Sequence, residues 1–92
     1  MRPCLFIGNL SFATTEQDVV SLFERAGGVV SCRLVCDRFT NRSRGFGFVE
    51  MGSQAEVAKA IAEFDGTKLD GRTLKVIVAR IRSRGWFHPD SG

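Results

Sequence analysis

Histidine and cysteine, the residues that most often carry metal and nucleophilic chemistry, are scarce in this chain. Its 92 residues include one histidine, His88, and three cysteines, Cys4, Cys32 and Cys36. Their spacing matches no metal-ligand pattern, and an odd number of cysteines favours free thiols in a reducing compartment over a disulfide framework. We therefore expect no metal, no cofactor and no disulfide.

The sequence also lacks the groupings that catalysis needs. It has no Ser/His/Asp set, no evident pair of carboxylates and no glycine loop suited to phosphate, and GFGFVE lacks the spacing of a dinucleotide fingerprint. No apolar run approaches the length of a membrane span, and the start MRPCLFIGNL turns polar too early for a signal peptide. We expect a cytoplasmic protein that is not an enzyme, takes no small-molecule substrate and does not contact a membrane.

What the chain does have is an ordinary globular composition with an excess of arginine. Hydrophobic residues make up 43% and charged residues 25%, which is typical of a folded domain, and the net charge of +3 is mildly basic. Most of the basic residues are arginines, which suit bidentate phosphate contacts and stacking. They gather over residues 38–44 and 72–84. On its own, this charge is a weak indication of nucleic-acid binding.

Hydrophobic periodicity predicts four strands and two helices. The strands are expected at CLFIG (4–8), VVSCRLVC (29–36), GFGFVEM (45–51) and TLKVIVAR (73–80). The helices are expected to begin after Thr15 and at a Ser53–Glu56 capping box, and to end at glycines. The side chains that we expect in the core from the helices and the first loop are Phe12, Val19, Leu22, Phe23, Ala26, Val57, Ala58, Ile61 and Phe64.

The order β-α-β-β-α-β predicts an α+β fold, the ferredoxin-like plait. Two right-handed crossovers of this kind give a four-stranded antiparallel sheet with both helices on one face. We expect this domain to cover residues 1–82 and to be followed by a short mobile tail, residues 83–92. The other face of the sheet is expected to be bare, and we call it the open face.

The stretch RGFGFVEM (44–51) indicates which side chains lie on the open face. Side chains alternate along a strand, so Arg44, Phe46, Phe48 and Glu50 point one way. Burying unpaired charges is costly, so this set is expected in water, while the glycines at 45 and 47 lie under the helices. An exposed aromatic pair beside arginine favours a ligand, although the Trp86–Phe87 pair of the tail could cover it instead.

RGFGFVEM resembles the RNP1 octamer of the RNA-recognition motif, and LFIGNL (5–10) is similar to its RNP2 hexamer. The resemblance covers residues 3–82 and extends to the small single-motif RNA-binding proteins of bacteria, including cyanobacteria. It implies that the partner is single-stranded RNA, with Phe6 and Phe48 stacking on bases and Phe46 packing against sugars. It also implies that Arg44 contacts a phosphate and that Asn9 lies at the edge of the surface.

Further contacts are expected around these positions. By alternation Arg33 and Lys75 share the open face, Arg80, Arg82 and Arg84 follow the last strand, and Arg38, Phe39 and Arg42 could add contacts from the loop between the second and third strands. Asn41 stands where relatives often have glycine, and Asn tolerates the left-handed conformation. We expect a monomer. Single-stranded DNA and a protein partner remain alternatives, because stacking does not detect the 2′-hydroxyl and this fold can also hold peptides.

Overall fold

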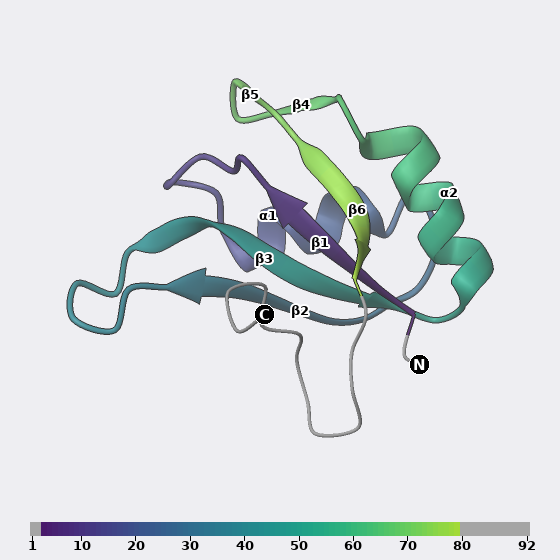
Figure 1. Ribbon diagram of the computed structural model, residues 1–92, viewed down its shortest axis with the longest axis horizontal. Coiled ribbons are helices and arrows are strands. Elements are labelled where there is room, and N and C mark those ends of the chain that lie inside the picture. The colour runs from purple at the N-terminus through teal and green to yellow at the C-terminus, as the bar shows by residue number, and fades with distance from the viewer. Residues whose placement is uncertain (1–2, 80–92) are drawn as a thin grey trace.

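A computed structural model of the chain describes residues 3–79. Its elements are β1 (Cys4–Gly8), α1 (Glu16–Phe23), β2 (Val29–Cys36), β3 (Ser43–Met51), α2 (Gln54–Phe64), β4 (Lys68–Leu69), β5 (Arg72–Thr73) and β6 (Lys75–Ala79). Figure 1 shows them with the sheet toward the viewer and α1 behind it. The predicted elements are all present, with α1 ending before the glycines and the last strand beginning at Lys75 instead of Thr73.

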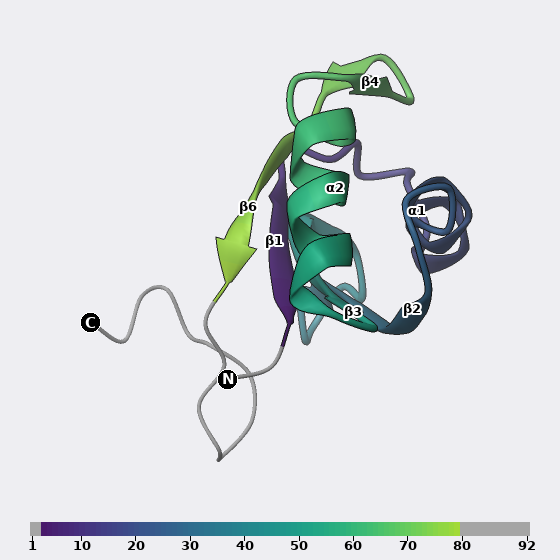
Figure 2. The ribbon, with the colours of Figure 1, turned by 90° about the vertical axis from the view of Figure 1, so that its right-hand side faces the viewer.

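The main sheet has the predicted architecture. Its four strands are antiparallel and follow the order β2-β3-β1-β6, so β1 and β3 are the central pair. Figure 2 shows α1 and α2 on the same side of this sheet. The prediction of an α+β plait with one open face is therefore confirmed.

A short hairpin of β4 and β5 was not predicted as strands. Each of its strands has two residues, which is too short for a periodic pattern. The turn between them is an Asp-Gly pair, and both turn residues have positive φ, 52° at Asp70 and 82° at Gly71. That combination is typical of the tight turns that connect antiparallel strands.

Both helices begin at the predicted caps, although the second cap differs in detail. Thr15 accepts a hydrogen bond from the Asp18 amide, and the Asp18 carboxylate accepts one from the Thr15 amide, so α1 has a full capping box. Ser53 accepts from the Glu56 amide, but the Glu56 carboxylate accepts from the Gly28 amide and from the Ser53 hydroxyl. Glu56 therefore joins α2 to the turn before β2 instead of completing a capping box.

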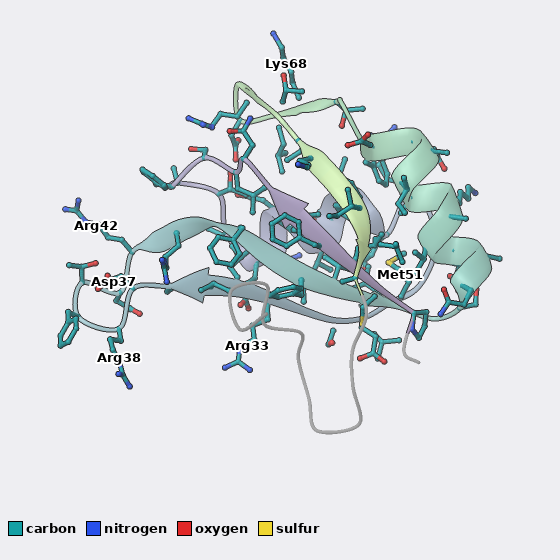
Figure 3. All side chains as sticks on the ribbon, viewed as in Figure 1. Arg33, Asp37, Arg38, Arg42, Met51 and Lys68 are labelled. Atoms are coloured by element: carbon teal, nitrogen blue, oxygen red, sulfur yellow. The ribbon has the colours of Figure 1, made fainter. Side chains whose placement is uncertain are left out.

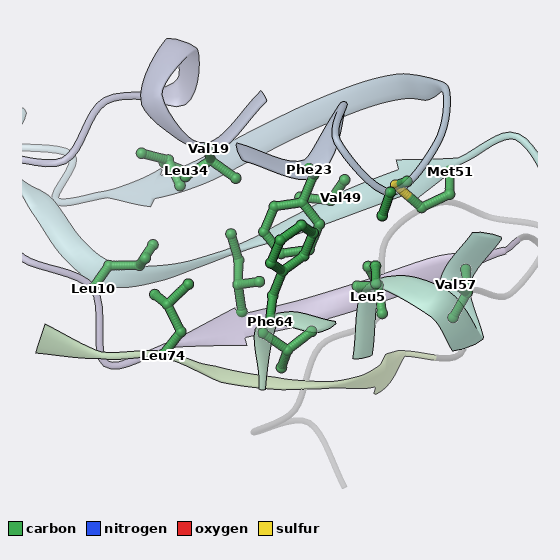
Figure 4. Close-up of a cluster of buried hydrophobic side chains, with 14 residues drawn as sticks. Leu5, Leu10, Val19, Phe23, Leu34, Val49, Met51, Val57, Phe64 and Leu74 are labelled. Atoms are coloured by element: carbon green, nitrogen blue, oxygen red, sulfur yellow. The ribbon is translucent and has the colours of Figure 1, made fainter. Parts of the chain in front are cut away.

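The core lies between the sheet and the two helices (Figure 4). The Phe23 and Phe64 rings meet at its centre, with centroids 5.0 Å apart. Leu22 and Ile61 are only partly buried. Ala60, and not Ala58 as predicted, faces the core, because it lies near Val57 and Phe64 on the buried face of the helix.

Phe12 was predicted to be a core residue, and that prediction is wrong. Its side chain is 75% exposed. Phe12 lies in the loop between β1 and α1, outside the alternating and helical patterns that turn side chains toward the core. Its aromatic character and its closeness in sequence to a strand and a helix did not suffice to predict whether its side chain is buried.

The glycines of β3 are buried, and the closest approach that they permit is to β2 and to the loop after β1. A Cβ atom on Gly47 would lie 2.8 Å from Cδ2 and 3.0 Å from Cα of Leu34, the residue opposite on β2. At Gly45, where φ is +84°, it would lie 3.2 Å from the Leu10 carbonyl oxygen. The missing side chains therefore let neighbouring strand and loop backbone pack against β3.

Carboxylates cover one backbone amide on each edge strand of the sheet. Glu16 of α1 accepts a hydrogen bond from the Leu34 amide of β2 at 3.0 Å, and Asp65 accepts one from the Val76 amide of β6 at 2.9 Å. Both amides lie on the outer side of their strands, where no neighbouring strand can pair with them. These side chains therefore satisfy donors that the sheet itself leaves unpaired.

Several predictions concern residues that the described part does not include. Arg80, Arg82 and Arg84, the tail over 83–92 and its Trp86–Phe87 pair all lie outside residues 3–79. Within the described range, no helix is long and apolar enough to span a membrane. In the same range, no three His, Cys, Asp or Glu side chains are placed to hold a metal ion.

No disulfide joins the three cysteines, and their different accessibility predicts an order of alkylation. Cys36 is exposed and Cys4 is fully buried. Burial, and then the charge of Glu16, raises the pKa of the Cys32 thiol to about 11. Because the thiolate is the reactive form, we expect iodoacetamide at mildly alkaline pH to modify Cys36 well before Cys32 and Cys4, as read by peptide mass spectrometry.

A Cys36→Ser variant provides the control for this prediction. It should lose the fast phase of alkylation and keep the slow one. Fast modification of Cys32 or Cys4 in the native protein would contradict the burial described here.

Candidate nucleic-acid interface

The register of the sheet brings one residue from each strand into a single row on the open face. Arg33 lies opposite Phe48, Phe48 opposite Phe6, and Phe6 opposite Ile77. A parallel row runs through Ser31, Glu50, Cys4 and Ala79. The open face therefore carries two aromatic rings at its centre, a cation at one edge and an apolar side chain at the other.

Phe6 is the centre of a three-ring cluster. Its centroid lies 5.8 Å from that of Phe46, with the planes tilted by 32°, and 5.8 Å from that of Phe48 in an edge-on arrangement at 67°. A Cβ atom on Gly8 would lie 2.9 Å from Cε1 of Phe6, so the missing side chain at Gly8 makes room for this ring. Phe6 and Phe46 are half-buried and leave part of their surface accessible.

Phe48 is on the open face as predicted, but the expectation that it lies in water is wrong. Its side chain is only 4% exposed. It packs in a second, smaller apolar cluster with Cys4 and Ala79, against which Phe6 and Val35 also pack. These neighbours come from β1, β2 and β6, so alternation within β3 alone did not predict the burial of Phe48.

The predicted basic residues of the sheet are exposed around this cluster. Arg33 is on β2, Arg44 on β3 and Lys75 on β6. The Arg44 guanidinium carbon lies 5.8 Å from the centroid of the Phe46 ring, within range of a cation–π interaction. Figure 3 shows Arg33 projecting from the β2 side of the molecule. Cations thus lie on both sides of the aromatic cluster.

Asn9 has a structural partner that the sequence did not reveal. Its side-chain amide donates to the Thr73 carbonyl oxygen at 2.7 Å, and its Oδ1 accepts from Arg72 Nη2 at 2.6 Å. The backbone of Asn9 adopts φ of 61°. Asn9 therefore ties the end of β1 to the β4–β5 hairpin and brings Arg72 to this edge. The partners are distant in sequence, so no local pattern pointed to the pair.

The loop between β2 and β3 is organised by Asp37. Its carboxylate accepts hydrogen bonds from the amides of Phe39 and Thr40, at 2.8 and 2.9 Å. Because these hydrogen bonds favour the charged carboxylate, they hold the pKa of the Asp37 carboxyl below its usual value, with the bond from the Thr40 amide contributing most and that from Phe39 next. Asn41 has φ of 61°, as its tolerance of the left-handed region predicted.

This turn presents the three predicted loop residues to solvent. Phe39 is 89% exposed, and Arg38 and Arg42 are exposed beside it. Figure 3 shows Arg38 and Arg42 projecting from the tip of the β2–β3 hairpin, away from the centre of the sheet. The structure therefore brings Phe6, Phe46 and Phe48 together and leaves the loop residues as a separate group.

Comparison with known proteins identifies the family. A family model described as RNA recognition motif matches residues 5–75. Small RNA-binding protein 11, chloroplastic, from Arabidopsis thaliana is 49% identical over 78 residues, which cover 85% of this chain and 53% of that protein. The chain spans between 22% and 53% of the length of the curated chloroplast relatives that it matches.

Solved structures agree with the family model. The crystal structure of RNA binding protein PG1 has a TM-score of 0.83 and 40% identity, covering 86% of this chain and 95% of that chain. An Sxl-lethal protein/RNA complex has a TM-score of 0.82 and 28% identity, covering 90% of this chain and 50% of that one. With the family model matched over most of the chain and the aromatic open face in place, the chain belongs to the RNA recognition motif family.

Proposed function

We propose that the protein binds a short segment of single-stranded RNA on the open face of its sheet. The observation that carries the proposal is the row of Arg33, Phe48, Phe6 and Ile77, which sets aromatic rings beside a cation on adjacent strands. Aromatic platforms flanked by positive charge suit single-stranded nucleic acid, because bases stack on rings while cations contact the backbone. The names of the relatives, RNA-binding protein and ribonucleoprotein, support the same partner.

In this proposal Phe6 stacks on one base and Phe46 packs against the adjoining sugar. Both rings are half-buried and keep accessible surface. Phe48 is 4% exposed, so stacking on Phe48 requires the groups that cover it to move aside; without that movement Phe48 serves to orient Phe6. Arg33, Arg44 and Lys75 contact phosphates. Two stacked bases and a few such contacts give an affinity on the order of micromolar.

A nuclear magnetic resonance titration tests the proposal. Isotopically labelled protein is titrated with a random-sequence single-stranded RNA pool and then with the matching DNA pool. The expected result is shifts centred on Phe6, Phe46 and Phe48, and the RNA–DNA difference measures how far the 2′-hydroxyl is recognised. Unshifted sheet resonances at saturating RNA would refute binding on this face.

The proposal also covers the oligomeric state of the protein, its cellular role and its compartment. We propose a monomer that acts without catalysis in post-transcriptional regulation or as an RNA chaperone. A cytoplasmic, reducing compartment fits the absence of a disulfide among the cysteines at positions 4, 32 and 36. Because Arabidopsis thaliana Small RNA-binding protein 11 carries the word chloroplastic in its name, cell fractionation should sample plastid as well as cytosolic fractions where the host has both.

Arg44→Ala is expected to change the salt dependence of binding. Each phosphate that a cation neutralises on single-stranded nucleic acid contributes a slope of about −0.7 to log K against log salt. Removing Arg44 should therefore flatten that slope by about one such contact, measured by fluorescence anisotropy over a salt series. Arg44 is exposed on β3, so folding should be little affected.

Lys59→Ala is the matched control for Arg44→Ala. Lys59 is also an exposed cation, but it lies on α2, on the opposite side of the sheet from the open face. Its removal changes the net charge equally and should leave the slope close to that of the native protein. Equal slopes for the two variants would remove Arg44 from the phosphate contacts.

A further inference from the structure

Phe12 is a large apolar side chain that the fold leaves in solvent at one end of the sheet. It is 75% exposed, in the loop between β1 and α1. The proposed function uses no residue of this loop beyond Asn9. Single exposed aromatic residues are common on protein surfaces, but this one is held by an ordered loop and has cations nearby.

The loop that carries Phe12 is fixed on both sides of the ring. On the N-terminal side, the Leu10 amide donates to the Gly45 carbonyl oxygen at 2.8 Å, which ties the loop to β3. On the C-terminal side, Thr14 is buried and its hydroxyl donates to Asp70 of the β4–β5 turn at 2.7 Å. The Ser11 hydroxyl also accepts from the Ala13 amide at 3.1 Å. The ring is therefore presented by an ordered backbone, which lowers the entropic cost of binding through it.

Phe12 also adjoins the proposed RNA-binding surface. A Cβ atom on Gly45 would lie 3.4 Å from Cε1 of the Phe12 ring, so the ring packs against the backbone between Arg44 and Phe46. The next residue after Gly45 is Phe46, whose ring centroid lies 5.8 Å from that of Phe6. Figure 1 shows the loop after β1 lying beside the start of β3, at the end of the sheet that this path reaches. Phe12 is thus the next aromatic group beyond Phe46.

The charges near this loop favour a nucleotide over an apolar peptide. Arg72 donates to Asn9 through both Nε, at 3.3 Å to the carbonyl oxygen, and Nη2, at 2.6 Å to Oδ1. Lys75 pairs with Gly8, the residue before Asn9, and is exposed. Arg44, which precedes the Gly45 backbone that Phe12 contacts, is also exposed. An exposed ring with cations on the neighbouring segments matches a base and its flanking phosphates.

We propose that Phe12 is an additional base-stacking position, which takes a nucleotide beyond the segment bound on the sheet, with Arg72 holding an adjoining phosphate. The inference rests on the proposed function and adds a length requirement to it. An RNA that covers only the sheet does not reach Phe12, while a longer strand does. Phe12 therefore extends the site without belonging to the RNP1 or RNP2 stretch.

Binding of two RNA lengths tests this inference. The probes are random-sequence RNA pools of about four and about eight nucleotides, chosen because the sheet is expected to take roughly the shorter length. Phe12→Ala should weaken binding of the longer pool by about tenfold, the effect of losing one stacked base. It should leave binding of the shorter pool at the native value.

Val30→Ala is the matched control. Val30 is an exposed apolar residue, 62% exposed, near the start of β2, and it has no place in the proposed site. It should bind both pools as the native protein does. Equal affinities of Phe12→Ala and native protein for the longer pool would overturn the inference, as would equal losses on both pools. Failure of the native protein to bind either pool would instead overturn the proposed function.

A fluorescence measurement tests direct contact. In a Trp86→Phe background, which removes the only tryptophan, Phe12→Trp introduces an indole at the proposed position. Stacking on a base should quench its emission with the longer pool and not with the shorter one. Val30→Trp in the same background should stay unquenched. If the longer RNA binds with native affinity and the indole at position 12 is not quenched, Phe12 does not stack on RNA and the inference fails.

Discussion

Gly47→Ala is expected to destabilise the domain by about 3 kcal/mol, at the upper end of what overpacking a well-packed site costs. The added methyl group would lie 2.8 Å from Leu34 Cδ2 and 3.0 Å from Leu34 Cα. Leu34 Cα and the Arg33 carbonyl oxygen, which is also close, are backbone atoms of β2, so relief requires β2 and β3 to separate. Urea denaturation followed by circular dichroism measures the loss.

Gly66→Ala separates the steric effect from the general cost of replacing glycine. Gly66 has φ of +85°, and a Cβ atom there would meet nothing within 4 Å. This variant should lose only the backbone strain of a left-handed alanine, about 1–2 kcal/mol. A Gly47→Ala midpoint equal to or above that of Gly66→Ala would contradict the close packing of β3 against β2.

Phe6→Ala is expected to have the largest effect on RNA binding. Phe6 contacts both other rings of the cluster and keeps accessible surface. Its loss should remove one stacking position and the support of the neighbouring rings, about 1–3 kcal/mol, which corresponds to an affinity loss of about 5- to 150-fold. Fluorescence anisotropy with a labelled random-sequence RNA measures the affinity, and thermal unfolding confirms that the variant is folded.

Two further substitutions distinguish the loss of stacking on Phe6 from a loss of protein stability. Phe6→Tyr keeps an aromatic ring and should retain most of the affinity. Phe48→Ala should lose stability as well as affinity, because Phe48 is 4% exposed and truncation of a buried phenylalanine costs about 3–5 kcal/mol. Native affinity in Phe6→Ala would refute stacking on this ring, and a Phe48→Ala protein of native stability would contradict the second apolar cluster.

Local patterns were sufficient to predict most of the fold. Alternation in RGFGFVEM placed the phenylalanines on the open face, because the other orientation would bury Arg44 and Glu50 in the core. Val49 and Met51, which alternate with them, are fully buried. The Thr15 cap and the helical spacing after it located α1. These features depend on interactions between residues close in sequence, which is why a single sequence was enough.

Long-range contacts account for what the sequence did not predict. Phe48 packs with Cys4 of β1 and Ala79 of β6, and the Asn9–Arg72 hydrogen bond joins residues far apart in the chain. Neither contact leaves a periodic trace. The exposed position of Phe12 follows from a loop held by Gly45 and Asp70, which are likewise distant. Phe48 and Phe12, the two misassigned aromatic residues, therefore lie in or beside the proposed site, where side chains from several elements meet.

The carboxylates at the two sheet edges have a consequence for how copies of this protein coexist. Proteins that bind the same transcript are brought to high local concentration, a condition that favours strand addition and aggregation between exposed sheet edges. Glu16 on the β2 edge and Asp65 on the β6 edge each occupy an amide that an incoming strand would need. An added strand would first have to displace a charged side chain. Crowding on RNA can therefore bring copies side by side without fusing their sheets.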